Sequence, residues 1–158
     1  MLFRSGLLAR PVAEGRLREA EELGLWLRGV FGRDRLSVEL QRPYARGDAH
    51  RNRLLTELAE RLRVRTVATG DPHAHSRRRA LLQDALVAIK KTTTLEACEA
   101  DRRGNHEAVL RAPAETAIRF PREAVRGAFE VADRCRFDLT QDLGYSYPDF
   151  GEIGRAHV

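Results

Sequence analysis

The residues of this chain best suited to chemistry lie in the short run Gly70–His75. Asp71, His73 and His75 are spaced by two, so in an extended segment their side chains would face the same way. Carboxylate and imidazole groups are ligands that suit zinc, manganese or iron. The spacing therefore predicts a metal site at these three residues. The alternative is a polar loop whose histidines hydrogen-bond to the backbone, since no second ligand cluster accompanies the run.

The charged residues near this run each allow a functional and a structural interpretation. Arg77, Arg78 and Arg79 follow the histidines and could hold a phosphate group or DNA by bidentate contacts, or they could form a solvated helix start. Glu39 ends an earlier strand and could reach the same rim, although a charge at a strand end is a commoner explanation. His50 and His106 lie in polar surroundings and are expected at the surface.

The elements that must position the candidate site follow from hydrophobic periodicity. Helical spacing predicts a helix over residues 14–31 and another beginning at Asp48, whose apolar stripe consists of Leu54, Leu55, Leu58 and Leu62. Strand-like patterns cover residues 36–40 and 66–69. A strand–helix–strand unit implies parallel strands and hence an α/β architecture, either an open sheet or a barrel. Ligands in such folds bind beyond the carboxyl ends of the strands, where Gly70–His75 lies.

The second half of the chain is expected to be mainly helical. The sequence predicts the helices 79–91 and 121–135, a short helix at the capping-box pattern 93–96, a polar loop over 99–112 and a helical turn at Pro113. Trp26 is expected to pack in the core. Cys98 and Cys135 are expected to be small core residues.

The composition indicates a globular chain rather than a disordered one. Of the 158 residues, 42% are hydrophobic and 32% are charged, and no apolar run is long enough to cross a bilayer. Two cysteines are too few for a disulfide framework, so a cytoplasmic location is expected. Because no apolar run could cross a bilayer, no membrane partner is expected. The formal charge of +5 favours an anionic partner such as nucleic acid, although an Arg-rich, Ala-rich bias also arises from a GC-rich genome.

The two ends of the chain are related at the nucleotide level. Back-translation of residues 2–5 as CTC TTC CGA TCT gives the reverse complement AGATCGGAAGAG, and this string in a shifted frame encodes residues 152–155. Such a relation resembles a sequencing adapter read at both ends of an insert. We therefore expect residues 1–5 and 152–158 to be adapter artefacts, which the codons of the gene would test.

Four segments in a fixed order resemble the PHP domain of bacterial C-family DNA polymerases, relatives of the DNA polymerase III alpha subunit. Residues 67–75 resemble the closing metal motif, and 82–89 the helix that follows it. Residues 128–137 and 142–148 are similar to the segments that lead from the PHP domain towards the polymerase core. The form Gly-Asp-x-His-Ala-His favours the error-prone branch, and the resemblance covers roughly residues 6–151.

This resemblance implies a fold and a divided metal site. The fold would be the C-terminal portion of a PHP-type distorted (β/α) barrel over residues 6–90, followed over 91–151 by helices leading towards the polymerase core. Asp71 and His73 carry over as metal ligands, with His75 as a further candidate. The metal would be zinc, manganese or iron. The remaining ligands would precede residue 6, and the palm aspartates with their magnesium would follow residue 151, so the chain holds no catalytic residue of the polymerase.

The resemblance also implies a function for the parent protein. The parent would be an error-prone DNA-directed DNA polymerase, a nucleotidyltransferase of translesion synthesis and DNA repair that acts on DNA and deoxynucleotides and contacts other translesion or replisome proteins. The present chain would be its PHP region only and inactive alone. Two alternatives stay open, a stand-alone metal-dependent PHP phosphoesterase and a non-catalytic PHP scaffold.

Overall fold

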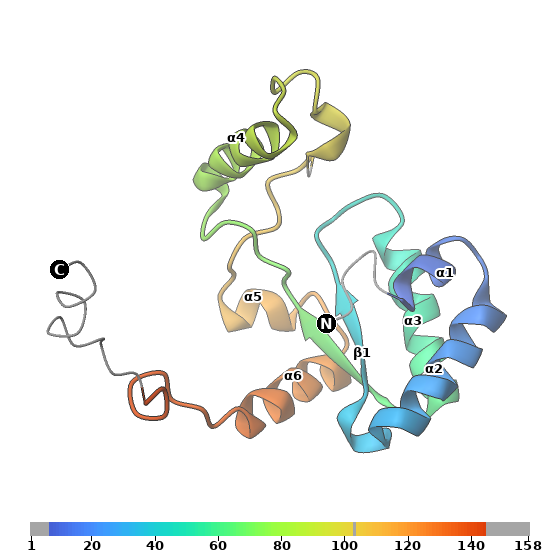
Figure 1. The fold of residues 1–158 in the computed structure, drawn as a ribbon. Coiled ribbons are helices and arrows are strands. Elements are labelled where there is room, and N and C mark those ends of the chain that lie inside the picture. Colours follow the sequence, from blue (N-terminus) through green and yellow to red (C-terminus); the bar gives the residue numbers. More distant parts are fainter. Residues whose placement is uncertain (1–6, 103, 145–158) are drawn as a thin grey trace, which may run out of the picture.

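The computed structural model describes residues 7–102 and 104–144 (Figure 1). Along the chain the elements are α1 Ala9–Ala13, α2 Leu17–Phe31, η1 Arg33–Arg35, β1 Ser37–Gln41, α3 Asp48–Leu62, β2 Arg65–Thr69, η2 Arg77–Arg79, α4 Ala80–Lys91, η3 Glu99–Asp101, α5 Pro113–Ala117 and α6 Arg122–Arg134. The expected adapter segments, residues 1–5 and 152–158, lie outside the described residues.

Strands β1 and β2 form a parallel pair, in the register that runs from Ser37 opposite Arg65 to Gln41 opposite Thr69. Helix α3 connects them, which confirms the predicted strand–helix–strand unit. Alternation explains β1, because Val38 and Leu40 are buried while the residues between them are only partly covered. The parallel pairing aligns the carboxyl ends of both strands at one edge.

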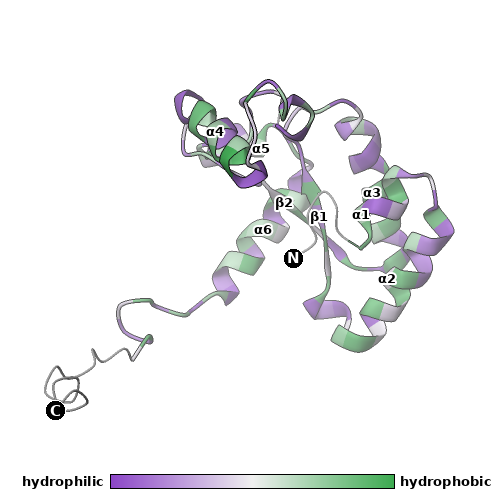
Figure 2. Ribbon diagram, turned by 45° about the horizontal axis from the view of Figure 1, so that its top comes forward, coloured by the Kyte–Doolittle hydropathy of each residue, from purple (hydrophilic) through white to green (hydrophobic). Residues whose placement is uncertain are grey.

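The strands lie between α6 on one side and the group α1–α3 on the other (Figures 1 and 2). The main core contains residues from both sides, namely Val12, Ala20, Val38, Leu40, Leu55, Leu58, Ala59, Leu62, Ala68 and Ala124. Helix α6 approaches β2 very closely at Gly127, where an added Cβ would lie 2.2 Å from the carbonyl oxygen of Thr66. This contact requires glycine and fixes α6 against the strand that leads to the candidate site.

Helix α4 stands apart from the strands together with η3 (Figure 1). The two segments that lead to this part are joined by a parallel bridge between Ala74 and Val109. Leucine and isoleucine side chains on α4, namely Leu81, Leu82, Leu86 and Ile89, are exposed. The helix itself is as predicted, but its apolar residues are not part of either core cluster of the described residues.

Several expectations for side chains and short elements are wrong. Trp26 is 61% exposed, because it lies on the side of α2 that faces away from the core. The buried side carries Gly24, which allows close contact with Leu62. Cys135 is exposed, whereas Cys98 is buried as expected. At residues 93–96 the structure has turns followed by η3 instead of an α-helix, although Ala97 N donates to Thr94 Oγ1 at 3.3 Å.

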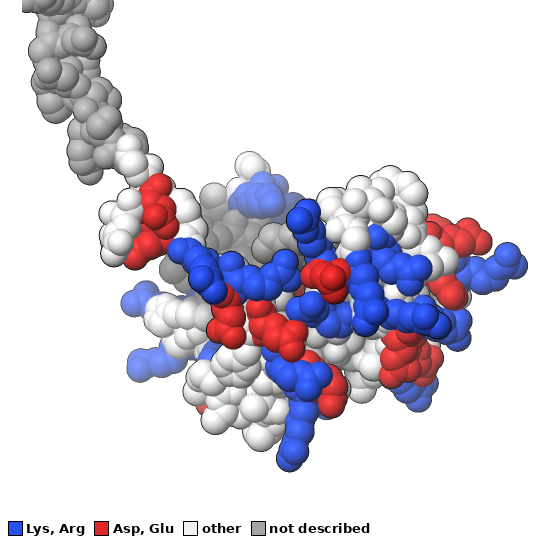
Figure 3. All heavy atoms as spheres, turned by 90° about the horizontal axis from the view of Figure 1, so that it is seen from below, with Lys and Arg blue, Asp and Glu red and all other residues white. Residues whose placement is uncertain are grey.

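Lys and Arg side chains form a broad band across the face drawn in Figure 3, and smaller groups of Asp and Glu side chains lie within and beside this band. Most ion pairs of the described residues join such neighbours at the surface, for example Arg61 with Glu21 and Arg65 with Glu130. In the described part of the chain, no helix is both long and apolar enough to span a bilayer.

Candidate functional site

Asp71 and His73 lie directly beyond the carboxyl end of β2, where the sequence predicted the site. His73 Nε2 is 3.3 Å from Asp71 Oδ1, and the Asp71 side chain is only 10% exposed. Gly70 separates the pair from the strand, and Asp71 has a φ of 42°, a left-handed conformation that aspartate tolerates better than most residues. The local turn thus brings carboxylate and imidazole together.

The backbone at this turn differs from the extended segment that the three-residue prediction assumed, and the role of His75 stays a prediction. Alternate side chains share a side only in an extended segment, and the left-handed Asp71 is not extended. His75 is exposed and does not form a three-residue ligand group with Asp71 and His73. Among residues 7–102 and 104–144, no group of three or more His, Cys, Asp or Glu side chains is placed to hold a metal ion.

A second segment, residues 105–111, supports the site from the side. The backbone N–H of His73 donates to the carbonyl oxygen of Ala108 at 2.8 Å, and Leu110 donates to Ala74 at 3.1 Å. This region was predicted to be a polar loop, because its pattern has neither helical nor strand periodicity. A partner strand segment of two or three residues carries no periodic signal.

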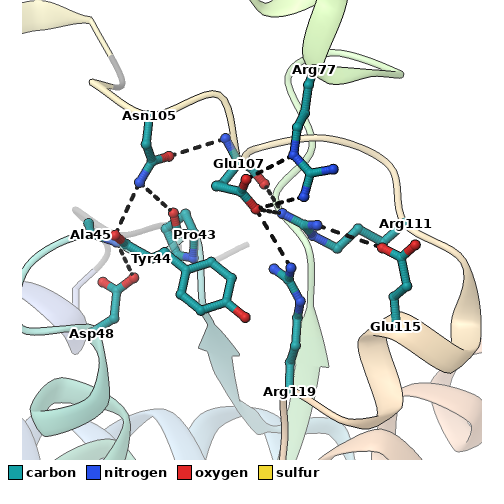
Figure 4. A network of polar contacts seen from close by, with 10 residues as sticks. All are labelled: Pro43, Tyr44, Ala45, Asp48, Arg77, Asn105, Glu107, Arg111, Glu115 and Arg119. Atoms are coloured by element: carbon teal, nitrogen blue, oxygen red, sulfur yellow. Dashed lines mark hydrogen bonds and ion pairs between the residues drawn. The ribbon is translucent and has the colours of Figure 1, made fainter.

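Glu107, on this second segment, is surrounded by three guanidinium groups (Figure 4). Arg77 donates to both of its carboxylate oxygens, at 2.9 and 3.2 Å, and Arg111 donates to Oε2. Arg119 Nη2 lies 3.6 Å from the same oxygen. The hydrogen bond from Arg77 and then that from Arg111 lower the pKa of Glu107 to about 2 despite its partial burial, so the carboxylate is charged throughout the physiological range.

Tyr44 and Asn105 form the wall of this cluster opposite Arg111 (Figure 4). The guanidinium of Arg119 lies over the Tyr44 ring at 4.4 Å from its centre, and that of Arg42 lies at 5.7 Å. Asn105 Nδ2 donates to the carbonyl oxygens of Pro43 and Tyr44, at 2.9 and 3.1 Å. The loop after β1 is thereby tied to the segment that carries Glu107.

The other charged candidates have local partners. Of Arg77, Arg78 and Arg79, which form η2, Arg77 binds Glu107 while all three remain exposed. Glu39 accepts hydrogen bonds from Thr69 Oγ1 and from Gln41 Nε2, so it links the strand ends.

Two further histidines of the described residues, His50 and His106, have partners of their own. His50 is an exposed residue beside Arg53 on α3. His106 Nε2 lies 3.8 Å from the buried Asp84, which also pairs with Arg102.

Chemically, the described site offers two neighbouring features. Asp71 and His73 provide one carboxylate and one imidazole, which fits a share of a transition-metal site but is fewer than the three or four protein ligands such a site needs. The Glu107 cluster provides a concentration of guanidinium groups next to it. Sequence reasoning found the first feature and, of the second, only Arg77.

The comparisons with known proteins point to one kind of relative. The chain is 38% identical over 128 residues to an error-prone DNA polymerase of Xanthomonas oryzae pv. oryzae, which is 80% of this chain and 12% of that protein. It is 35% identical over 143 residues to an error-prone DNA polymerase of Pseudomonas fluorescens, which is 90% of this chain and 14% of that protein. No protein-family model matches the chain.

A third relative shows the same relation over a shorter length. An error-prone DNA polymerase of Allorhizobium ampelinum is 36% identical over 103 residues, 64% of this chain and 9% of that protein. The chain therefore spans between about one tenth and one seventh of the curated relatives it matches. Over most of its length, this chain is related to a segment of bacterial error-prone DNA polymerases.

Proposed function

We propose that this chain is the C-terminal part of the PHP domain of an error-prone DNA-directed DNA polymerase, with the helices that connect it to the polymerase core. The observation that carries the proposal is the 35–38% identity to such polymerases over 80–90% of the chain. Because the matched relatives are several times longer, DNA and deoxynucleotide binding belong to the proposed parent, and the chain alone neither polymerises nor hydrolyses.

Within that parent, Asp71 and His73 would supply two ligands of the PHP metal site. Their support is the 3.3 Å approach of His73 Nε2 to Asp71 Oδ1 beyond the carboxyl end of a parallel strand. A divalent metal bound there would polarise a phosphoester and activate water. The role of this chain's own residues is to hold the carboxylate and the imidazole in place, through Gly70 and the backbone bonds of His73 and Ala74 to Ala108.

One observation favours a second candidate, the non-catalytic PHP scaffold. In the part of the chain that the structure describes, no group of three or more His, Cys, Asp or Glu side chains is placed to hold a metal ion. In that case the segment would brace the polymerase without binding metal. The stand-alone phosphoesterase has no comparable support, since the matched relatives are long polymerases. Sequencing the flanking DNA separates it from the polymerase, because a stop codon shortly after this segment would support the hydrolase.

A chimeric polymerase tests the proposal directly. Residues 7–144 of this chain would replace the matching segment of the Xanthomonas oryzae relative, and both primer extension and bound metal would be measured. We expect the chimera to extend primers, because the segment would take the place of an equivalent one. A chimera that is folded yet inactive in extension would contradict the assignment to this part of a polymerase.

Paired variants of the same chimera test the metal site. Asp71→Ala and His73→Ala are each expected to lower the affinity for zinc, manganese or iron by about tenfold or more. Loss of a metal ligand lowers the affinity at least as much as loss of a residue that hydrogen-bonds to a ligand. His50→Ala, at an exposed position of α3, should leave the metal content unchanged. Equal metal content in all variants, measured by mass spectrometry, would favour the scaffold.

A further inference from the structure

The Glu107 cluster holds more hydrogen-bond donors than its own carboxylates can satisfy. The side chains of Arg111 and Arg119 are only 7% and 13% exposed. The Nη1 atom of each is buried and has no hydrogen-bond partner among the described residues. Arg111 Nη1 does have an ion-pair contact with Glu115 Oε2, but at 3.7 Å this is beyond hydrogen-bond distance. Buried charged donors without an acceptor are costly, which makes this pair unusual.

The charge balance of the cluster is also positive. Arg77, Arg111 and Arg119 bring three guanidinium groups, whereas Glu107 and Glu115 bring two carboxylates. Both buried guanidinium groups approach the same atom, Glu107 Oε2. An excess of guanidinium groups around the partly buried Glu107 attracts an anion that has several acceptor oxygens.

The chemical type of the donors suits a phosphate group. Guanidinium groups bind phosphate with two parallel N–H donors, and the two orphaned Nη1 atoms come from side chains already held in place. Arg111 is fixed by its bonds to the carbonyl and carboxylate of Glu107, and Arg119 by stacking on Tyr44. Little side-chain entropy would therefore be lost when the anion binds.

An approach from solvent exists beside the cluster. Arg42 and Arg119 line a hollow of about 440 Å³ between α3 and the segment before α6, bordered also by Asn52 and Phe120. Arg77, on the other side of Glu107, is 59% exposed and is therefore accessible to an anion from solvent. Of the two buried arginines, Arg119 borders the hollow directly, and Arg111 lies behind it against Glu107.

We propose that Arg111 and Arg119, assisted by Arg77, form a phosphate-binding site in which the carboxylate of Glu107 competes with the bound phosphate. The ligand is a phosphate group, either free or carried by a nucleotide or a nucleic-acid backbone. This site is distinct from the Asp71–His73 pair, requires no metal, and does not depend on the polymerase assignment.

Phosphate binding to the full chain tests the proposal. Equilibrium dialysis with radiolabelled inorganic phosphate measures affinity even if the chain associates. Arg119→Gln is expected to weaken binding by about tenfold, the usual scale for one lost charge-assisted contact. The matched control is Arg126→Gln, which removes the same charge from the exposed surface of α6 and should change binding little. Equal affinity of these two variants would overturn the proposal.

A second variant keeps the test decisive if Arg119→Gln does not fold. Glu107→Gln removes the competing charge while keeping the shape of the side chain, so we expect phosphate to bind about threefold or more tightly. Circular dichroism would confirm that each variant retains its helices. Unchanged or weaker binding in a folded Glu107→Gln variant would contradict the competition on which the site rests.

The source of the phosphate is decided by competition. A single-stranded oligonucleotide that displaces labelled phosphate from the original chain, but has a weakened effect with Arg119→Gln, would identify a nucleic-acid backbone as the ligand. Displacement by a mononucleotide but not by the oligonucleotide would identify a free or nucleotide phosphate. If labelled phosphate does not bind saturably at all, the proposal is wrong.

Discussion

At the scale of single residues, Glu107 couples the stability of the chain to pH. Hydrogen bonds from Arg77 and then Arg111 lower its pKa in the folded chain from 4.5 to about 2. A carboxyl group with a depressed folded pKa stabilises the fold above its unfolded pKa, and that contribution is lost as the pH falls through the folded value. The loss therefore falls between about pH 4.5 and pH 2.

We predict that Glu107→Gln removes this part of the acid transition. The variant should lose about 2 kcal/mol at pH 7, a figure discounted for the exposure of Arg77, and less at pH 2. Urea unfolding at a series of pH values measures the difference. Glu57→Gln, at an exposed position of α3, serves as the control, because its pair with Arg53 at 3.9 Å is solvated. A difference from the original chain that is the same at pH 2 and pH 7 would contradict the role of the carboxylate.

At the scale of elements, the contact of α6 with β2 depends on one glycine. A Cβ at residue 127 would lie 2.2 Å from Thr66 O, a backbone atom that cannot move without shifting the strand. We expect Gly127→Ala to destabilise the chain by about 2–4 kcal/mol through overpacking and displacement of α6. Thermal unfolding followed by circular dichroism measures this loss.

The control for that prediction lies in α2. A Cβ at Gly29 meets nothing within 4 Å, so Gly29→Ala should instead stabilise the chain by about 0.5–1 kcal/mol through helix propensity. The two substitutions thus have opposite expected signs, although both replace a helical glycine by alanine. If Gly127→Ala were also neutral or stabilising, α6 would not lie against β2 as closely as the structure places it.

At the scale of the whole molecule, the exposed apolar side of α4 affects solution behaviour. Leu82, Leu86 and Ile89 have spacings that place them on one side of the helix, and all are more than half exposed. Such a surface favours association in water. We predict that the chain self-associates at tens of micromolar, roughly the range of weak apolar contacts, and that Leu86→Gln with Ile89→Gln shifts it towards the monomer.

Sedimentation velocity measures this association. Leu110→Gln is the control, because Leu110 is similarly exposed but lies outside α4. Association that persists in the double variant, or a chain that is already monomeric at high concentration, would show that α4 is not the surface responsible.

Much of the local structure was predictable because it depends on near neighbours in the sequence. Hydrophobic period and turn residues located α2, β1, α3, β2, α4 and α6, and the parallel pairing followed from the strand–helix–strand order. The same reasoning placed Asp71 and His73 beyond a strand end. The PHP barrel and the domain boundaries at residues 90 and 91 remain predictions.

Tertiary structure decided what depends on distant residues. Hydrophobic periodicity predicts that α2 has an apolar side, but it does not show which side packs against α3. In the structure the side that carries Gly24 lies against Leu62, and Trp26 is left exposed. The turn at Asp71, where φ is positive, brings His73 Nε2 to 3.3 Å from the Asp71 carboxylate. Arg77, Glu107 and Arg119 meet only when separate segments fold together, because a pairing of side chains thirty residues apart leaves no trace in local sequence patterns.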